Sequence, residues 1–243
     1  MTKRMFIGTP LAIIFSGLAV YAIFSMFSSE NTAGLEMPLS GQIIVIDPGH
    51  GGVDGGSSAS DGTQEKEIAL AISLKLRDYL QASGALVLMT REDDSDLAAS
   101  DTQGYSNRKT EDLKNRLALI NETNSDYYIS LHLNAIPSPR WRGAQTFYNR
   151  TFEDSKNMAE SVQSEMIRQL ENTNRTALAI NGKYIVDQAK IPGVLVEVGF
   201  LSNPDEAADL QSEEYQDKIA ASIYQGMLRY KVPEMAKENE AEQ

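Results

Sequence analysis

The chain contains two histidines, and each one comes directly after a short run of apolar residues. His50 lies in DPGHGG, which follows the apolar run 43–46, and His132 lies in SLHLN, at the end of the run 127–131. Such runs predict buried strands, and an open α/β sheet places its binding sites at the carboxyl ends of its strands. A lone histidine is more often a structural residue. The equivalent positions of these two favour a shared function at one edge of a sheet.

Two neutral imidazoles are the usual beginning of a zinc site, and a carboxylate is the usual third ligand where cysteine is absent. Four acidic residues are candidates for that third ligand: Asp47, Asp54, Glu65 and Glu67. Glu65 opens a predicted helix, where its side chain either turns back toward the strand ends or stabilises the helix dipole. The spacing leaves this choice open. Asp47 is better placed to orient a ligand histidine through its second ring nitrogen.

Glu197 stands inside an apolar segment, GVLVEVGF, where an unpaired charge is costly to bury. Strand alternation places Leu195, Glu197 and Gly199 on one side of the predicted strand. A structural ion pair is one interpretation of Glu197. The other is a general base beside a metal site, because partial burial brings a carboxylate pKa closer to neutral pH. Three protein ligands leave a fourth zinc position for water, which suits amide hydrolysis without identifying the amide.

Strand and helix patterns alternate along the chain, which predicts one α/β domain with a mostly parallel central sheet flanked by helices. Apolar periodicity predicts helices over 65–83, 112–121, 153–170 and 215–230, and strands over 43–46, 85–90, 127–131, 143–149 and 194–199. We expect 143–149 to be an edge strand. The polar stretch 98–109 has no clean period and is interpreted as a surface loop.

Composition excludes several classes of protein. The 243 residues are 42% hydrophobic, enough for a substantial core, so wholesale disorder is excluded. A net charge of −12 argues against a nucleic-acid partner, because no basic face is available for phosphates. The chain has no cysteine, which rules out disulfides, thiolate zinc sites and a cysteine nucleophile.

Residues 1–35 are predicted to be an N-terminal signal anchor and tether. Lys3 and Arg4 precede a mainly apolar run over 5–27, long enough to span a bilayer. The positive charges would keep the N-terminus in the cytoplasm and place the domain that follows, 36–231, outside it. No clear cleavage site follows, so an uncleaved anchor is favoured over a cleaved signal peptide or a buried core helix. Residues 232–243 form an acidic tail.

An ordered set of motifs resembles the zinc-dependent N-acetylmuramoyl-L-alanine amidases of the type 3 family. The motifs lie at 47–52, 65–66, 90–91, 130–135 and 196–203, and the match extends over nearly all of 42–230. The resemblance implies that His50, Glu65 and His132 bind zinc and that Glu197 is the catalytic carboxylate. It also implies cleavage of the amide between the lactyl group of N-acetylmuramic acid and L-alanine in peptidoglycan. Leu131 replaces the isoleucine of the family pattern, a change that keeps the strand apolar.

Within that family, the anchor followed by one catalytic domain is similar to the germination-specific spore cortex amidases of endospore formers. The segments 104–113, 132–138 and 223–230 also look like them. The resemblance implies removal of stem peptides from spore cortex, ahead of muramic-δ-lactam formation by a downstream deacetylase. It further implies a location at the forespore membrane or cortex and a possible sporulation partner protein.

Two other functions compete with the amidase. Zinc carboxypeptidases usually carry a glutamate three residues after the first ligand histidine, but this chain has Val53 there. A catalytically weak wall-binding or regulatory protein could retain the amidase fold, but such a protein would be expected to lose Glu197 or a ligand. Neither loss is seen in this sequence.

Overall fold

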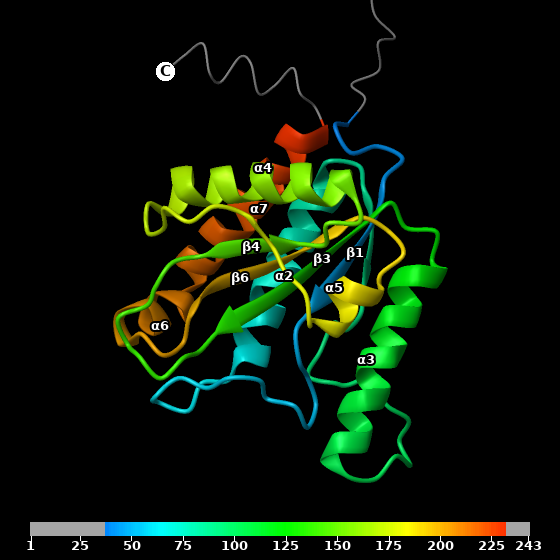
Figure 1. Ribbon diagram of the computed structural model, residues 1–243, viewed down its shortest axis with the longest axis vertical. Helices are drawn as coiled ribbons and strands as arrows, with labels where there is room; N and C mark the ends of the chain where they lie inside the picture. Colours follow the sequence, from blue (N-terminus) through cyan, green and yellow to red (C-terminus); the bar gives the residue numbers. More distant parts are fainter. Residues whose placement is uncertain (1–36, 232–243) are drawn as a thin grey trace, which may run out of the picture. The chain divides into compact units, whose positions relative to one another are not determined.

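Six strands form one mixed sheet in residues 37–231, the part of the chain that the computed structural model describes (Figure 1). The strands are β1 (Ile43–Pro48), β2 (Leu86–Met89), β3 (Tyr127–Asn134), β4 (Gln145–Tyr148), β5 (Leu178–Ala179) and β6 (Gly193–Phe200). Their order is β2-β1-β3-β6-β4-β5, and β2, β1, β3 and β6 are mutually parallel. The predicted single α/β domain with a largely parallel sheet is therefore confirmed.

The prediction of an edge strand at 143–149 was wrong in one respect. β4 pairs antiparallel with β6, but β5 pairs with its other side and forms the edge of the sheet. β5 has only two residues, Leu178 and Ala179. A pattern of alternating polarity needs more residues than that, so the sequence could not indicate this strand.

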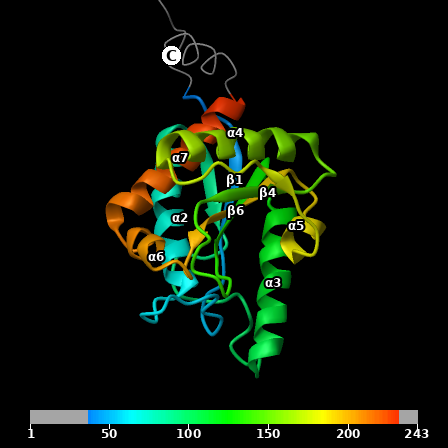
Figure 2. The same ribbon diagram turned by 60° about the vertical axis from the view of Figure 1, so that its left-hand side comes forward.

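Helices cover both faces of the sheet, as Figure 2 shows. They are α2 (Glu65–Ala82), α3 (Tyr105–Glu122), α4 (Glu153–Leu170), α5 (Tyr184–Gln188), α6 (Pro204–Leu210) and α7 (Glu213–Lys231). α2, α4 and α7 contribute to the larger apolar cluster, together with strand residues such as Ile46, Leu131 and Val196. On the opposite face, α3 and α5 pack on a smaller cluster around Val45 and Tyr128.

The start of α3 differs from the sequence prediction, which treated 98–109 as a loop. The helix begins at Tyr105. The side chains of its first turns bind charged partners instead of the apolar core: Arg108 pairs with Asp96, and Lys109 Nζ lies 2.8 Å from Asp54 Oδ2. A helix end held by ion pairs has no apolar periodicity, which is why the pattern did not reveal it.

The predicted anchor, 1–35, and the acidic tail, 232–243, lie outside the described residues. Among the helices that the structure describes, none is both long enough and apolar enough to cross a bilayer.

The topology brings three segments to one edge of the sheet. β1 and β3 are neighbours with Pro48 opposite Leu131, and β3 and β6 are neighbours with His132 opposite Glu197. The carboxyl ends of these parallel strands therefore meet, and α2 begins beside them with Glu65 as its first residue.

Candidate active site

His50 follows β1 in an unusual backbone conformation. Its φ angle is 62°, in the left-handed region that non-glycine residues rarely adopt. The buried guanidinium of Arg116 on α3 holds this turn by donating hydrogen bonds to the carbonyl oxygens of Pro48 and His50. Arg116 is itself fixed by ion pairs at 2.9 Å to Asp47 and 2.8 Å to Asp112. The strained turn is thus maintained by a buried ionic network.

His132 lies near the end of β3. The glycine that directly follows β1 leaves space for the imidazole ring of His132. A Cβ atom on Gly49 would come within 2.5 Å of the imidazole, so a larger residue there would displace the ring. The imidazoles of His50 and His132 have centroids 5.0 Å apart and an interplanar angle of 80°. The two histidines therefore meet as the sequence predicted.

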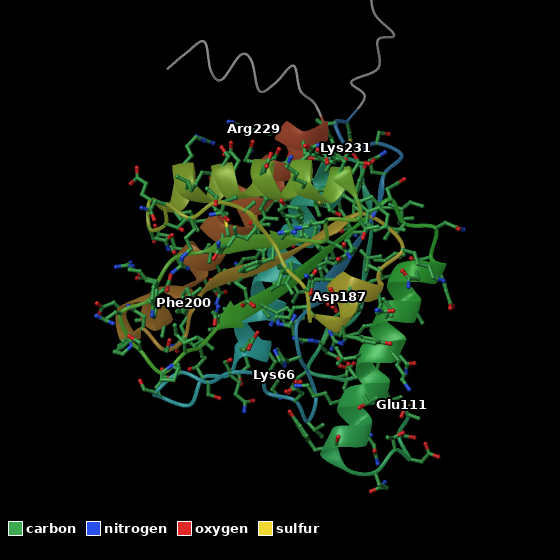
Figure 3. The ribbon with its side chains drawn as sticks, in the orientation of Figure 1. Lys66, Glu111, Asp187, Phe200, Arg229 and Lys231 are labelled. Carbon is green, nitrogen blue, oxygen red and sulfur yellow. The ribbon has the colours of Figure 1, made fainter. Side chains whose placement is uncertain are left out.

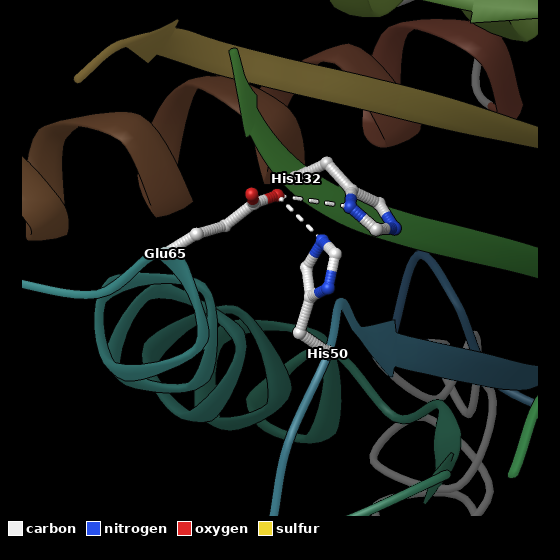
Figure 4. A group of neighbouring side chains, drawn as sticks. All are labelled: His50, Glu65 and His132. Carbon is white, nitrogen blue, oxygen red and sulfur yellow. Dashed lines mark hydrogen bonds and ion pairs between the residues drawn. The ribbon is translucent and has the colours of Figure 1, made fainter. Parts of the chain in front are cut away.

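The carboxylate of Glu65 lies between the two rings (Figure 4). Its Oε1 is 3.2 Å from His50 Nε2 and 3.0 Å from His132 Nδ1, and it also accepts a hydrogen bond from the backbone N–H of Leu133. Its Oε2 accepts a hydrogen bond from Ser57 N–H. One ligand atom from each of the three side chains lies within 4.8 Å of the other two. The Glu65 side chain therefore turns back toward the strand ends, one of the two placements that the sequence spacing allowed.

The other candidate carboxylates are placed differently. Asp54 Oδ2 lies 2.8 Å from His50 Nδ1, on the side of the ring that faces away from Glu65. Asp47 does not contact the His50 ring. It accepts hydrogen bonds from Thr90, Ser130 and Arg116. Glu67 is exposed on α2. The orienting contact predicted for Asp47 is therefore made by Asp54.

Negative charge surrounds the two imidazoles. Burial alone would lower the pKa of His50, but the carboxylates of Asp54 and Glu65 raise it to about 9. Burial acts in the opposite direction on Glu65, yet hydrogen bonds to His132 and His50 hold the pKa of that carboxyl well below its usual range. Such a site attracts positive charge.

Glu197 lines the same pocket, which has a volume of about 390 Å³. Its side chain is buried, and Oε2 has no hydrogen-bond partner among the described residues. Burial raises the pKa of Glu197, while the nearby side chains of His132 and Lys183 partly oppose that rise. Lys183 Nζ lies 3.9 Å from Oε1. A buried carboxylate with a free oxygen can accept a proton from a molecule bound in the pocket.

Sequence reasoning missed three residues that line this pocket: Tyr105, Lys109 and Lys183. Tyr105 and Lys109 belong to the turns of α3 that were predicted as a loop, and both bind Asp54. Lys183 precedes the short helix α5, and no local pattern marks it. Asn134, which lies in the motif 130–135, also lines the pocket. Arg91 binds backbone carbonyl oxygens of Pro48, Gly49 and Lys66, a structural role.

The chain is similar to known proteins in both sequence and structure. The chain is 53% identical over 194 residues to the germination-specific N-acetylmuramoyl-L-alanine amidase of Bacillus subtilis, covering 80% of this chain and 81% of that protein. It is similar to the CwlD amidase of Clostridioides difficile, solved in complex with the GerS lipoprotein. That match has a TM-score of 0.76 and 42% identity, and covers 78% of this chain and 98% of the other.

A second solved structure, an N-acetylmuramoyl-L-alanine amidase from Clostridium difficile 630, matches with a TM-score of 0.68 and 32% identity. That match covers 78% of this chain and 96% of the other. The family model described as N-acetylmuramoyl-L-alanine amidase matches residues 44–229. This range includes all of the described strands except the first residue of β1, and it includes His50, Glu65, His132 and Glu197 of the pocket. The chain therefore belongs to the N-acetylmuramoyl-L-alanine amidase family.

Proposed function

We propose that this chain is a zinc-dependent amidase that hydrolyses the bond between N-acetylmuramic acid and L-alanine in peptidoglycan. The observation that carries the proposal is the placement of Glu65 between His50 and His132. The catalytic carboxylate in this proposal is Glu197, which lines the same pocket. Membership of the amidase family supports the choice of amide.

The three side chains fit a zinc ion. In a tetrahedral site with ligand bonds of about 2 Å, neighbouring ligand atoms lie roughly 3.3 Å apart. The separations of Glu65 Oε1 from His50 Nε2 and His132 Nδ1, 3.2 and 3.0 Å, are close to that spacing. Two imidazoles and one carboxylate are also a common ligand set of catalytic zinc sites, which keep a further position for water or substrate. His50, Glu65 and His132 would therefore hold the metal.

The reaction needs a Lewis acid and a proton carrier. A zinc ion held at this site would polarise the scissile carbonyl and acidify a water molecule. Glu197 accepts the proton of the water that attacks the carbonyl carbon. When the C–N bond breaks, Glu197 returns that proton to the departing amine of L-alanine. The products are a free lactyl carboxylate on the sugar and a peptide with a free N-terminus.

The biological setting is proposed from the relatives. The B. subtilis relative is described as germination-specific, and the C. difficile CwlD was solved with the GerS lipoprotein. We infer that this chain removes stem peptides from spore cortex before a deacetylase forms muramic-δ-lactam, and that a sporulation lipoprotein is its partner. In this proposal, residues 1–35 anchor a catalytic domain, 36–231, outside the cytoplasm at the forespore membrane.

The test incubates the purified chain and zinc with spore peptidoglycan and measures released peptides by mass spectrometry. Stem peptides with a free N-terminal alanine are expected. Their release should be abolished by a chelator and by Glu197→Gln, and metal analysis should find about one zinc per chain. A zinc-loaded chain that releases no peptide would contradict the proposed activity. It would favour a wall-binding role.

A further inference from the structure

A second hollow lies on the loops that follow β3 and α4. It has a volume of about 430 Å³ and is lined by Trp141, Arg142, Glu171, Asn172, Thr173, Asn174 and Arg175. Trp141 is the only tryptophan in the chain, and its side chain is 49% exposed. The hollow therefore combines one large aromatic surface with hydrogen-bonding groups, two arginines and one acidic side chain, so its charged groups are positive on balance.

The walls of this hollow are held in place by several contacts. Arg175 donates a hydrogen bond of 2.7 Å to the carbonyl oxygen of Gly143. Its guanidinium lies 5.8 Å from the Trp141 ring centroid and 4.8 Å from that of Phe200. A Cβ atom on Gly143 would come within 2.5 Å of the Asn172 carbonyl oxygen, so the two loops are in close contact. The aromatic and cationic groups are therefore preorganised.

Residues at the ends of two adjacent strands connect the hollow with the active-site pocket. Asn134 lines the pocket and is the register partner of Phe200, which ends β6. Figure 3 labels Phe200 at that end of the strand. Adjacent strands lie about 5 Å apart, so Phe200 is about that far from Asn134. The guanidinium of Arg175 lies near the ring of Phe200 and also near the ring of Trp141. A polymer bound at the active site can reach Trp141 without leaving this edge.

The chemistry of the lining favours a charged sugar over a protein partner. Arg142 and Arg175 form no ion pair within residues 37–231, although the whole chain has a net charge of −12. The Asn172 Oδ1 atom is buried and has no hydrogen-bond partner among the described residues. Amide, hydroxyl and guanidinium groups around one indole suit sugar hydroxyl, acetamido and carboxylate groups, whereas protein interfaces have an apolar centre.

We propose that Trp141, Arg142 and Arg175 form a glycan subsite that binds the next N-acetylmuramic acid of the peptidoglycan strand, one disaccharide away from the muramic acid whose stem peptide is released, through its free lactyl carboxylate. The sugar ring stacks on the exposed part of Trp141, and its carboxylate pairs with Arg142 and Arg175. This inference rests on the proposed function, since it extends the same substrate beyond the cleaved bond. It makes the enzyme prefer strands that have already lost some stem peptides, because hydrolysis creates free lactyl carboxylates.

Binding at this subsite can be measured by the fluorescence emission of Trp141, because the chain contains no other tryptophan. The probe is an oligomer of alternating N-acetylglucosamine and N-acetylmuramic acid without peptides, which contains no bond to be hydrolysed. We expect a saturable change in emission and a Kd about tenfold weaker for Arg142→Gln. Arg150→Gln, which changes an exposed arginine outside the hollow, is the matched control and should not alter the Kd. A neutral N-acetylglucosamine oligomer should bind more weakly.

Kinetics separate this inference from the proposed function. Trp141→Ala should raise KM about tenfold on long strands while leaving kcat/KM on a single muramoyl-peptide unchanged. No emission change with the charged oligomer, or equal affinity of Arg142→Gln, would overturn the subsite and favour a protein-contact surface. Absence of turnover on the single muramoyl-peptide would count against the proposed function alone, because the oligomer titration does not depend on hydrolysis.

Discussion

The two faces of the sheet are built on different physical principles. The face under α2, α4 and α7, three long helices that Figure 2 shows on one side of the sheet, is packed with aliphatic side chains. The face under α3 and α5 has a small apolar cluster and, beside it, the buried polar group of Asp47, Thr90, Asp112, Arg116 and Ser130. The candidate active site lies at the carboxyl end of this second face.

This difference indicates that one face of the sheet mainly stabilises the fold, whereas the other mainly positions the residues of the candidate active site. Aliphatic burial is non-directional and stabilises in proportion to the area removed from water. Ion pairs and hydrogen bonds are directional, so they can fix the backbone of His50 and the ring of a ligand while adding little net stability. Changes on the aliphatic face should therefore alter unfolding alone, whereas changes on the polar face should also alter metal binding and turnover.

The largest expected effect is on turnover, from Glu197→Gln. The amide has nearly the same volume but cannot accept the proton of the attacking water, so kcat should fall by about 10²–10⁴-fold. Peptide release measures the rate, and urea unfolding should remain close to that of the parent chain. Glu160→Gln on the exposed surface of α4 is the control. Turnover within a few fold of the parent would refute the assigned role.

On the aliphatic face, Leu76→Ala should lower the free energy of unfolding by about 2–5 kcal/mol, because a fully buried side chain leaves a cavity. Zinc affinity of the folded protein should not change. Urea unfolding monitored by circular dichroism measures the first quantity, and a zinc titration measures the second. Leu178→Ala, at a side chain 47% exposed, should cost no more than about 0.5 kcal/mol. Weakened zinc binding in Leu76→Ala would contradict the prediction that the aliphatic face affects unfolding without affecting the metal site.

On the polar face, Asp54→Asn should weaken zinc affinity by about 10–100-fold, because the His50 ring loses the carboxylate that orients it. Competition with a chromophoric chelator gives the affinity. Asp94→Asn is a matched control: Asp94 binds Lys66 and the Gly52 N–H nearby without touching either histidine. Equal affinities of the Asp54 variant and the parent would show that the orienting contact is dispensable.

Acid should affect the polar face first, through Asp47. Burial alone would raise its pKa, but Arg116, Thr90 and Ser130 lower it below the usual value. A depressed folded-state pKa means that the stabilisation is complete above about pH 4, the unfolded value, and declines as pH falls below it. The slope from this one group is at most about 1.4 kcal/mol per pH unit. Urea unfolding at a series of pH values from about 5 to about 3 measures this slope.

Asp47→Asn sharpens this prediction, since the amide does not titrate. The variant should be less stable than the parent at neutral pH, because Arg116 loses an ion-pair partner. The gap in the free energy of unfolding between variant and parent should become smaller as the pH falls below about 4. A gap that stays constant over that range would show that Asp47 does not cause the acid sensitivity.

Local patterns in the sequence were enough to predict the main elements. The predicted helix 153–170 coincides with α4, and the strand 194–199 lies within β6. Apolar spacing is imposed by the partner surface that a helix or strand covers, so it can be recognised without coordinates. The same reasoning predicted that His50 and His132 would meet, because each follows a strand of the same parallel sheet.

Contacts between distant residues could not be predicted in this way. Glu65 and His132 are 67 positions apart, and their contact depends on the path of the loop before α2. Four carboxylates had plausible positions, and only packing placed Glu65 between the rings and Asp54 behind His50. The resemblance to the amidase family named Glu65 as a ligand, but residue spacing alone did not.

The sequence by itself determined the α/β class, the edge of the sheet that carries the chemistry and the buried carboxylate Glu197. Only the tertiary structure decided which groups surround that chemistry: Lys183 beside Glu197, Arg116 behind His50, and Trp141 against Arg175. The physical reason is how far apart along the sequence the interacting residues lie. Periodicity reports the local requirement to bury one face of an element, whereas directional contacts depend on where separate loops come together in the folded chain.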